Sequence, residues 1–332
     1  MSATDLDNEV ASHLKSLLPD DSYASLRDTV LPTLLSSIGA VAEALRTSSR
    51  VSQLGSSNSF GDDQLNVDVA AEDIIRKALS SCPSIVTASS EEDPVERMKT
   101  DAARVEGDLE HYTLAFDPLD GSSIIAPNWS VGTIIGVWKG TTAIGQNPEN
   151  QIASVLGVYG PRTSAIVAVR HLSAITACFE VGINFAEERL ATELLRPQVR
   201  LEEGPFKTRY FAPANMRAAA ENHKYMELIT HYISQKYTLR YSGGLVPDVV
   251  HALVKGHGVY ISPVTEKSKA KLRRLYELAP IALIIECAGG VAVDPVTGER
   301  ILGKAIENTD ERGGLICGTS HEVRFAIHKL SG

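Results

Sequence analysis

Two aspartates near the middle of the chain have the spacing of a metal-binding turn. Asp117 and Asp120 are separated only by a proline and a leucine, and they directly follow an apolar stretch. A turn at the end of a strand can project both carboxylates into one pocket and expose the Leu119 carbonyl between them, and such oxygen ligands suit magnesium. The small residues that follow offer backbone amides that can bind a phosphate closely: Gly121, Ser122 and Ser123.

The same run also fits an ordinary turn, because Asp, Pro, Gly and Ser dominate turns. Further acids favour a site: Glu91 and Glu92 follow a second apolar stretch, and Asp62 and Asp68 flank the start of a predicted helix. Each alone can be a solvated acid or a partner of the helix dipole. Together they supply the carboxylates of a two-metal phosphatase, in which the ions neutralise phosphate oxygens and help to convert water into a nucleophile.

The elements that position these acids can be predicted from the spacing of apolar residues. Apolar stretches at 84–88, 112–116 and 133–138 predict central strands, with further strands at 152–159 and 165–169. Apolar residues three and four apart predict helices at 30–46 and 67–79. The Ser-, Gly- and Asn-rich segment 47–61 predicts a mobile surface loop, and 187–195 predicts a helix that ends at Arg196-Pro197.

The second half of the chain repeats the alternation of helices and strands. We expect a helix at 221–236, a turn at 242–244, a helix opening at Pro247, a strand near Val259, and a helix from Pro280 that ends at Gly289-Gly290. Alternation in both halves predicts a layered α/β protein. We place a domain boundary near residue 200, which separates residues 1–200 from residues 201–332.

Composition limits the classes of partner. The chain has 332 residues, of which 43% are apolar, enough for a large core, and a net charge of -9, which argues against nucleic acid and anionic membranes. No apolar stretch approaches the ~20 residues of a membrane span, and no secretory or transit signal is visible. Four widely spaced cysteines predict reduced thiols, so we expect the cytoplasm: Cys82, Cys178, Cys287 and Cys317.

Several motifs together resemble the fructose-1,6-bisphosphatase family in order and spacing, from about Ser56 to Phe325. They are Gly-Asp-Asp-Gln at 61–64, Val-Asp-Val at 67–69, Ser-Glu-Glu at 90–92, the run 116–123, and Lys-Leu-Arg-Arg-Leu-Tyr-Glu at 271–277. The sequence is most similar to the sedoheptulose-1,7-bisphosphatase branch at 58–62, 158–163, 237–241 and 243–248. The resemblance implies the sugar phosphatase fold, a layered α-β-α-β-α sandwich.

The resemblance also implies roles for single residues. Metal ligands would be Glu91, Asp117, Asp120 and Glu277, with the Leu119 carbonyl and Glu92 as further candidates, for two or three Mg2+ ions that Mn2+ can replace. Asp62, Asp68 and Glu92 would activate the attacking water, and Gly121, Ser122 and Ser123 would hold the 1-phosphate. Asn215, Arg240, Tyr241 and Lys271 would hold the sugar and the far phosphate, with Arg240 open to being supplied by a neighbouring subunit.

Plainer roles stay open for some of these residues. Tyr241 can be a core residue and Asn215 a helix cap. The basic run from Lys267 to Arg274 is typical of a solvated face, and only Lys271 in it gains a role from the resemblance. Family fructose bisphosphatases carry a tyrosine where this chain has Ile261-Ser262-Pro263, which favours a different sugar.

The resemblance implies a magnesium-dependent hydrolase that converts sedoheptulose 1,7-bisphosphate to sedoheptulose 7-phosphate, in carbohydrate metabolism linked to the pentose phosphate pathway. Fructose 1,6-bisphosphate, as sole or second substrate, is the alternative within the family. An inositol monophosphate phosphatase and a catalytically inactive sugar-phosphate sensor are alternatives outside it. The expected partners are a small sugar bisphosphate and a second copy of the chain, with a homodimer favoured over a tetramer.

Overall fold

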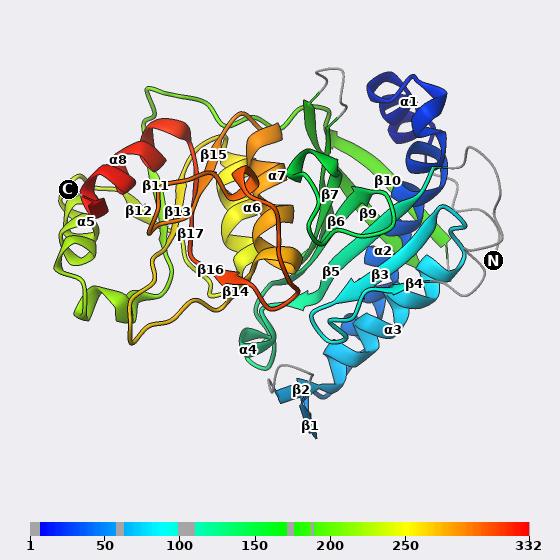
Figure 1. Ribbon diagram of the computed structural model, residues 1–332, viewed down its shortest axis with the longest axis horizontal. Coiled ribbons are helices and arrows are strands. Elements are labelled where there is room, and N and C mark those ends of the chain that lie inside the picture. The colour runs from blue at the N-terminus through cyan, green and yellow to red at the C-terminus, as the bar shows by residue number, and fades with distance from the viewer. Residues whose placement is uncertain (1–6, 58–62, 99–109, 171–175, 187–188, 332) are drawn as a thin grey trace.

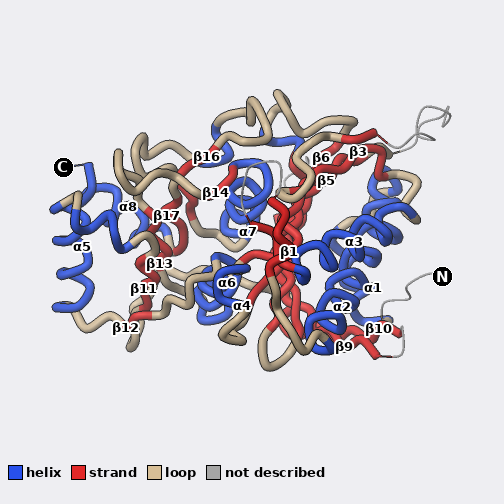
Figure 2. The backbone as a smooth tube through the Cα atoms, turned by 90° about the horizontal axis from the view of Figure 1, so that it is seen from below, coloured by secondary structure: helices blue, strands red, loops and turns tan. Residues whose placement is uncertain are grey.

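The computed structural model describes residues 7–57, 63–98, 110–170, 176–186 and 189–331. Its elements form five layers, helix, sheet, helix, sheet and helix, which are visible in two perpendicular views (Figures 1 and 2). The predicted α-β-α-β-α sandwich is therefore confirmed. Among the described residues, none of the helices is both long and apolar enough to cross a membrane.

Three helices near the N-terminus form the first outer layer: α1 (Asn8–Leu17), α2 (Leu31–Thr47) and α3 (Asn66–Ser80). Short helical turns at Asp21–Tyr23 and Leu26–Val30 lead into α2. The predicted apolar face of α2, which includes Leu34, Ile38 and Val41, is buried against β7, β8 and β9 of the first sheet. The helices predicted at 30–46 and 67–79 are thus confirmed.

The first sheet has eight strands in the order β10-β9-β8-β7-β6-β5-β3-β4, and only the pair β3 and β5 is parallel. All five strands predicted in this half of the chain are present. The bounds are β3 (Ile85–Ser90), β4 (Arg97–Met98), β5 (Tyr112–Asp120), β6 (Val131–Lys139), β7 (Gln151–Tyr159), β8 (Thr163–Arg170), β9 (Thr176–Ala186) and β10 (Arg189–Arg196).

Two predictions in the first half of the chain were wrong. The segment predicted as a helix at 187–195 contains β10, which pairs antiparallel with β9. Leu190 and Leu194 are four residues apart, a spacing that places both on one face of a helix or of a strand. Pairing along β9 favours the strand. The segment predicted as a loop at 47–61 contains β1 (Gln53–Ser57), which pairs antiparallel with β2 (Asp63–Leu65).

The second sheet has the order β12-β11-β13-β17-β15, and it lies between a middle and an outer layer of helices. Its strands are β11 (Tyr210–Pro213), β12 (Thr238–Leu239), β13 (Val259–Ser262), β15 (Val291–Val293) and β17 (Leu315–Gly318). The middle layer holds α6 (Leu245–Lys255) and α7 (Ala279–Cys287), and the outer layer holds α5 (His223–Ser234) and α8 (Ser320–Ser331). Two small elements complete the chain: α4 (Ser122–Ile125) and the ribbon of β14 (Leu272–Arg273) with β16 (Arg312–Gly313).

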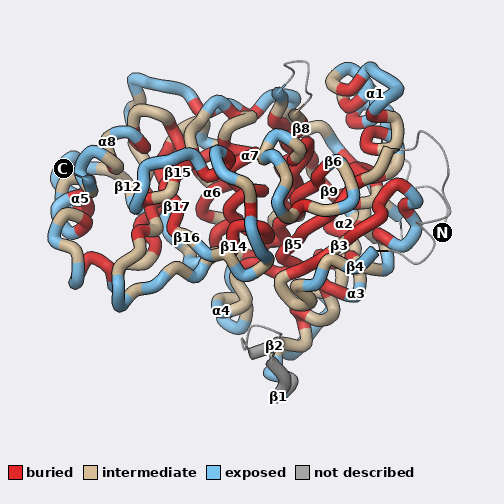
Figure 3. The backbone as a smooth tube through the Cα atoms, in the orientation of Figure 1, coloured by how far each residue is buried: buried red, intermediate tan, exposed pale blue. Residues whose placement is uncertain are grey.

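Helix α7 lies at the centre of the molecule, where burial is densest (Figure 3). Every residue from Ala279 to Ile285 is buried, as expected for a helix that is apolar all round and has a sheet on each side. One apolar cluster joins α7 to residues of both sheets, such as Ile134 and Tyr260. The two halves therefore share a core, and the boundary near residue 200 stays a prediction.

Candidate active site

Three buried carboxylates meet where β5 ends beside the segment that leads into α7. Asp117 and Asp120 come from β5, and Glu277 comes from a π-helical turn, Arg274–Leu278, that continues into α7. One carboxylate oxygen of each lies within 4.8 Å of the others. The fold thus brings together three acids that are about 160 residues apart in the chain, and the family resemblance implied all three as metal ligands.

Burial and mutual repulsion make this cluster unfavourable while it is negatively charged. Burial, and then the charges of Glu91, Asp120 and Glu277, raise the pKa of Asp117 well above its usual range. Burial raises the pKa of Asp120 to about 6, and burial followed by the Glu91 charge raises the pKa of Glu277. Cations among these oxygens would remove the repulsion, because a nearby positive charge favours the ionised form.

Backbone amides fix the direction of all three carboxylates. Asp120 accepts hydrogen bonds from the N–H groups of Leu245 (3.1 Å) and Val246 (2.7 Å), in the first turn of α6. Asp117 accepts from the Leu119 N–H at 3.0 Å, and Glu277 accepts from the Arg273 N–H at 2.5 Å. These bonds favour the charged form and oppose the effect of burial. The cluster is therefore built to remain ionised when cations are present.

Glu91 is a fourth acid at this site, and its charge is paired with the side chain of Arg273. Its carboxylate forms an ion pair with Arg273, whose side chain is only 3% exposed. The charge of Glu91 acts on both Asp117 and Glu277, which places it beside the cluster. The prediction that the basic run 267–274 is a solvated face was wrong for Arg273 and Arg274, which are buried.

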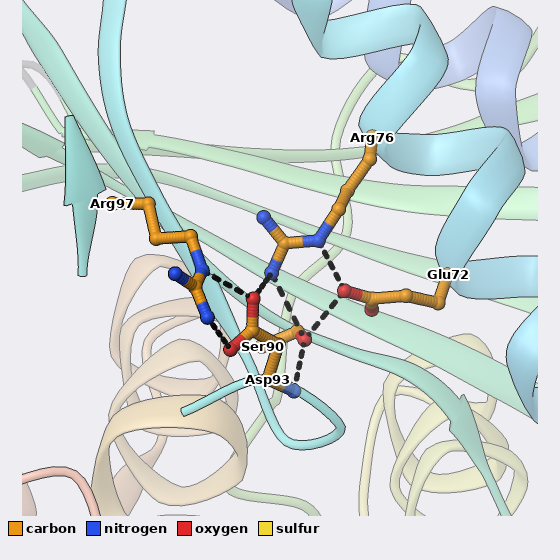
Figure 4. Close-up of polar contacts among 5 residues, drawn as sticks. All are labelled: Glu72, Arg76, Ser90, Asp93 and Arg97. Atoms are coloured by element: carbon orange, nitrogen blue, oxygen red, sulfur yellow. Dashed lines mark hydrogen bonds and ion pairs between the residues drawn. The ribbon is translucent and has the colours of Figure 1, made fainter. Parts of the chain in front are cut away.

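A network of polar side chains holds the turn that carries Glu91 and Glu92 (Figure 4). The Ser90 hydroxyl donates to Glu72 at 2.8 Å and accepts from the Asp93 N–H at 3.0 Å. Arg76 contacts Glu72, Ser90 and Asp93 from α3, and Arg97 donates twice to Asp93. The Glu91 N–H also donates to the Phe116 carbonyl at 3.0 Å. This turn is therefore a fixed part of the sheet edge.

The predicted water-activating residues lie next to this turn. Asp68 is buried in the first turn of α3, where one oxygen accepts from the Leu65 N–H at 3.0 Å and the other has no hydrogen-bond partner among the described residues. Burial, opposed by this bond and assisted by the Glu92 charge, raises the pKa of Asp68 to about 7. Asp68 and Glu92 are thus neighbours, and Asp62 lies outside the described residues.

The three residues proposed to hold a phosphate follow Asp120 directly. Gly121 adopts φ = 93°, a left-handed conformation that favours glycine, and its carbonyl accepts from the Ile124 N–H at 2.9 Å. Ser122 is half-buried and Ser123 is exposed in the short α4. The turn therefore places two serine hydroxyl groups directly after Asp120 in the chain.

A cavity of about 740 Å³ lies beside α6. Arg240 and Tyr241 line it, as do Tyr159 and Asp248, and the charges of Asp248 and Asp120 help to raise the pKa of Tyr241 after burial. Tyr241 is exposed, so the reading of it as a core residue was wrong. The remaining lining residues are Asn128, Trp129, Ser130, Gly160, Pro161, Ser242, Pro247 and His251.

Two predicted sugar-binding residues lie apart from this cavity lining. Asn215 adopts φ = 49° and donates from its amide to the carbonyls of Pro263 (2.7 Å) and Ser268 (3.4 Å), so it fixes the loop that leads toward Lys271. The alternative prediction, that Asn215 caps a helix, was wrong in one respect: the Asn215 side chain makes no capping hydrogen bond. The Lys271 side chain is exposed just before β14.

The donor set suits magnesium. Asp117, Asp120, Glu277 and the adjacent Glu91 offer only oxygen ligands, which Mg2+ prefers. In an octahedral shell with bonds of about 2.0–2.1 Å, ligand oxygens stand roughly 3–4 Å apart, which is compatible with the carboxylate oxygens here, all within 4.8 Å of one another. The raised pKa values of the buried acids give independent support, since an uncompensated cluster of this kind is costly.

Several residues that the sequence predictions missed contact the acids of the site or the turns that carry them. Arg273 pairs with Glu91, and Glu72 anchors the Ser90 turn. Tyr159 shares a 2.6 Å hydrogen bond with Thr133, whose hydroxyl donates to the Pro118 carbonyl at 2.7 Å, in the turn between Asp117 and Asp120. A possible signal for Glu72 was its position four residues after Asp68, on the same side of a helix. Nothing in the local sequence distinguished Arg273 from the other basic residues of its run.

Comparison with known protein families agrees with this geometry. Residues 20–185 match the model "Fructose-1-6-bisphosphatase, N-terminal domain", and residues 205–330 match "Fructose-1-6-bisphosphatase, C-terminal domain". The chain is 36% identical to the chloroplastic sedoheptulose-1,7-bisphosphatase of Spinacia oleracea, over 85% of this chain and 70% of that protein. It is 38% identical to the Triticum aestivum counterpart, over 80% of this chain and 63% of that protein.

Further relatives have matching lengths. The class 1 fructose-1,6-bisphosphatase of Geobacter sulfurreducens is 34% identical, over 88% of this chain and 87% of that protein. The crystal structure of a Toxoplasma gondii protein provisionally named sedoheptulose-1,7-bisphosphatase superposes with a TM-score of 0.82 at 33% identity, covering 97% and 98% of the two chains. Leishmania major fructose-1,6-bisphosphatase, at 24% identity and a TM-score of 0.80, shows the same fold. The chain belongs to the fructose-1,6-bisphosphatase family of sugar bisphosphatases.

Proposed function

We propose that this protein hydrolyses the 1-phosphate of sedoheptulose 1,7-bisphosphate in a magnesium-dependent reaction and releases sedoheptulose 7-phosphate and phosphate. The observation that carries the proposal is the buried cluster of Asp117, Asp120 and Glu277 beside Glu91. The turn 121–123 follows Asp120 directly, and the charge of Asp120 acts on Tyr241, which lines the cavity of about 740 Å³. Acids, anion-binding amides and a sugar-sized space are the three parts such a reaction needs.

In this proposal Glu91, Asp117, Asp120, Glu277 and the Leu119 carbonyl hold two or three Mg2+ ions, for which Mn2+ can substitute. Bound divalent ions would neutralise the phosphate oxygens and lower the pKa of a bound water. The amides that hold Asp117, Asp120 and Glu277 keep their oxygens directed before substrate arrives. Such preorganisation reduces the rearrangement that the reaction would otherwise require.

Asp68 and Glu92, together with Asp62, are proposed to take the proton of the attacking water. A base is most effective when its pKa is near the working pH, and Asp68 meets this condition with a pKa of about 7. Its second carboxylate oxygen has no hydrogen-bond partner among the residues described, so it is available to a water molecule. The charge of Glu92 helps to keep Asp68 basic.

The phosphate groups are proposed to bind at the two ends of the site. Gly121, Ser122 and Ser123 would hold the reacting 1-phosphate, because the left-handed Gly121 turns their amides and hydroxyls next to Asp120. Arg240, Tyr241, Asn215 and Lys271 would hold the sugar and the far phosphate. Within the described part of the chain Arg240 forms no ion pair, and it stacks over the Tyr210 ring at 5.8 Å. Its charge is therefore available to a phosphate of the same subunit or of a neighbour.

The seven-carbon substrate is preferred because the spinach and wheat relatives are named for it. Fructose 1,6-bisphosphate is the second candidate, since the Geobacter relative is named for that substrate. The match to this chain also spans a larger share of that relative's length than of the spinach or wheat protein. Steady-state phosphate release from both sugars with magnesium separates the two. A higher kcat/KM for fructose 1,6-bisphosphate would reverse the preference.

We further propose that the protein works in the cytoplasm as a homodimer and serves carbohydrate metabolism linked to the pentose phosphate pathway. No disulfide bond joins Cys82, Cys178, Cys287 or Cys317 in the described part of the chain, which suits a reducing compartment. A dimer would allow Arg240 of one subunit to reach the site of the other. Light scattering of the purified protein, with the Arg240→Ala variant in parallel, tests this assembly.

A further inference from the structure

The segment between β12 and α6 connects the two ends of the proposed site. It begins with Arg240 and Tyr241, which line the cavity, and it ends at Leu245 and Val246, whose N–H groups hold Asp120. The residues between them form a tight turn with Gly243 at φ = 102°. Whatever fixes this turn therefore sets the position of the sugar-binding side chains relative to the metal-binding acid.

Asp248 fixes the turn from inside α6. Its Oδ1 accepts a hydrogen bond from the Ser242 N–H at 2.7 Å, and its Oδ2 accepts one from the Gly243 N–H at 3.3 Å. The Asp248 residue is 94% buried and lines the cavity. The Ser242 hydroxyl adds a 3.3 Å bond from the Gly244 N–H. Two carboxylates, Asp120 and Asp248, thus hold successive amides of one short segment.

A plainer role for Asp248 would be to stabilise the helix dipole, since it lies in the first turn of α6. That role needs only a negative charge near the helix start. The observed bonds go instead to the amides of the preceding turn, and both oxygens are used. Charge-assisted bonds of this kind are strong and directional, so they specify the conformation of the turn as well as its charge.

We propose that Asp248 is a positioning residue for the sugar end of the site, which holds the turn at Ser242 and Gly243 so that Arg240 and Tyr241 face the substrate. The inference rests on the proposed function. Asp120 keeps its own bonds to Leu245 and Val246 when Asp248 is changed, so the metal end should be affected less. Loss of Asp248 should therefore weaken binding of a bisphosphate more than it slows the chemical step.

The test compares Asp248→Asn and Asp248→Ala with the wild type on two substrates. Sedoheptulose 1,7-bisphosphate needs both ends of the site, whereas p-nitrophenyl phosphate has no far phosphate. We expect KM for the bisphosphate to rise about tenfold in Asp248→Asn, which keeps one acceptor oxygen, and more in Asp248→Ala. We expect kcat to change by less than about threefold, and kcat/KM for p-nitrophenyl phosphate to change equally little.

Two further variants keep the test decisive. Gly243→Ala strains the same turn through its positive φ, and its added Cβ would meet the Ile124 side chain of α4 at 3.3 Å and no carboxylate. It should reproduce the rise in KM even if Asp248→Ala does not fold. Asp20→Asn is the matched control, because Asp20 also accepts from a turn amide, Ser22 N–H at 2.9 Å, but does so beside α1. Circular dichroism melting confirms that each variant is folded.

The outcomes separate this inference from the proposed function. If the wild type releases no phosphate from the bisphosphate with magnesium, the proposed function fails. If the wild type is active but folded Asp248→Asn and Gly243→Ala keep the wild-type KM, the positioning role is wrong while the function stands. Equal losses on both substrates, mainly in kcat, would also overturn it, because they would place Asp248 in the chemistry.

Discussion

Asp120 at the end of β5 accepts a 2.7 Å hydrogen bond from the backbone N–H of Val246 at the start of α6. This contact joins the first sheet to the middle helix layer at the point where the acidic cluster lies. It has two consequences. The Asp120 carboxylate is held in one orientation, and α6, which follows the segment with Arg240 and Tyr241, is attached to the turn that carries Asp117 and Asp120.

Replacing Asp117 should abolish most activity while leaving the fold intact. Asp117→Asn removes a charge from the centre of the cluster, where it would hold a cation against the phosphate. We expect kcat to fall by roughly two to four decades, the range for loss of a strong electrostatic stabiliser. Phosphate release with saturating magnesium measures the effect. Asp294→Asn, which changes an aspartate that caps an exposed turn, is the control, and an active Asp117→Asn would remove our metal assignment.

Removing divalent ions should make stability depend on pH. Asp117, Asp120, Glu277 and Asp68 all have pKa values raised in the folded state, to about 6 for Asp120 and about 7 for Asp68. For raised acids the stabilising contribution is present below pH 4 and is lost as the pH rises through the folded pKa. The metal-free protein should therefore melt several degrees lower at pH 8 than at pH 5.5.

Magnesium should reverse this trend, because it binds the ionised form of the cluster. Calorimetric melting at both pH values, with EDTA and with excess Mg2+, tests the expectation. The stabilisation by Mg2+ should be greater at pH 8 than at pH 5.5. Equal stabilisation at the two pH values would indicate that the ions bind somewhere other than these acids.

Arg273 should stabilise the metal-free protein more than the metal-bound one. Arg273→Gln leaves Glu91 beside three other acids without its partner, and breaking a buried ion pair from one side costs about 3 kcal/mol. Denaturant unfolding in EDTA should show a loss of this size, and Mg2+ should recover much of it. Arg46→Gln, which breaks an exposed pair with Glu43 within α2, should cost much less. Equal losses with and without Mg2+ would contradict this role.

Arg240 and Lys271 should affect binding of the far phosphate. Arg240→Ala and Lys271→Ala should each raise KM for the bisphosphate several-fold, with little change in kcat, because the lost contacts form equally in ground and transition states. Arg324→Ala, an exposed arginine of α8, is the control for loss of charge. Unchanged KM values would favour a phosphatase that acts on monophosphates, such as an inositol monophosphate phosphatase.

Local patterns in the sequence predicted much of the fold. Apolar stretches located the five strands β3, β5, β6, β7 and β8, since buried strands need continuous apolar residues. The prediction of a helix at 187–195 was wrong because the spacing of Leu190 and Leu194 suits both a helix and a strand. Pairing with β9 determines that the strand forms. β1 escaped notice because its Ser- and Gly-rich sequence has little strand preference.

The site was predictable only where its chemistry is local. Asp117 and Asp120 share one turn, whereas the contribution of Glu277 depends on a chain crossing between layers and was inferred through family resemblance. Arg273 was missed because its burial follows from packing against Glu91, far away in the sequence. Asp248 was missed because its two bonds depend on the conformation of a glycine turn.

With divalent ions bound, the cluster of Asp117, Asp120 and Glu277 is proposed to remove one phosphate from a ketose bisphosphate. The most direct test is to measure phosphate release from sedoheptulose 1,7-bisphosphate by the wild type and by Asp120→Ala, each with Mg2+ and with EDTA. We predict rapid release of one phosphate per sugar by the wild type with Mg2+, and almost none in the other three reactions. Undiminished release with EDTA, or by Asp120→Ala, would contradict the account.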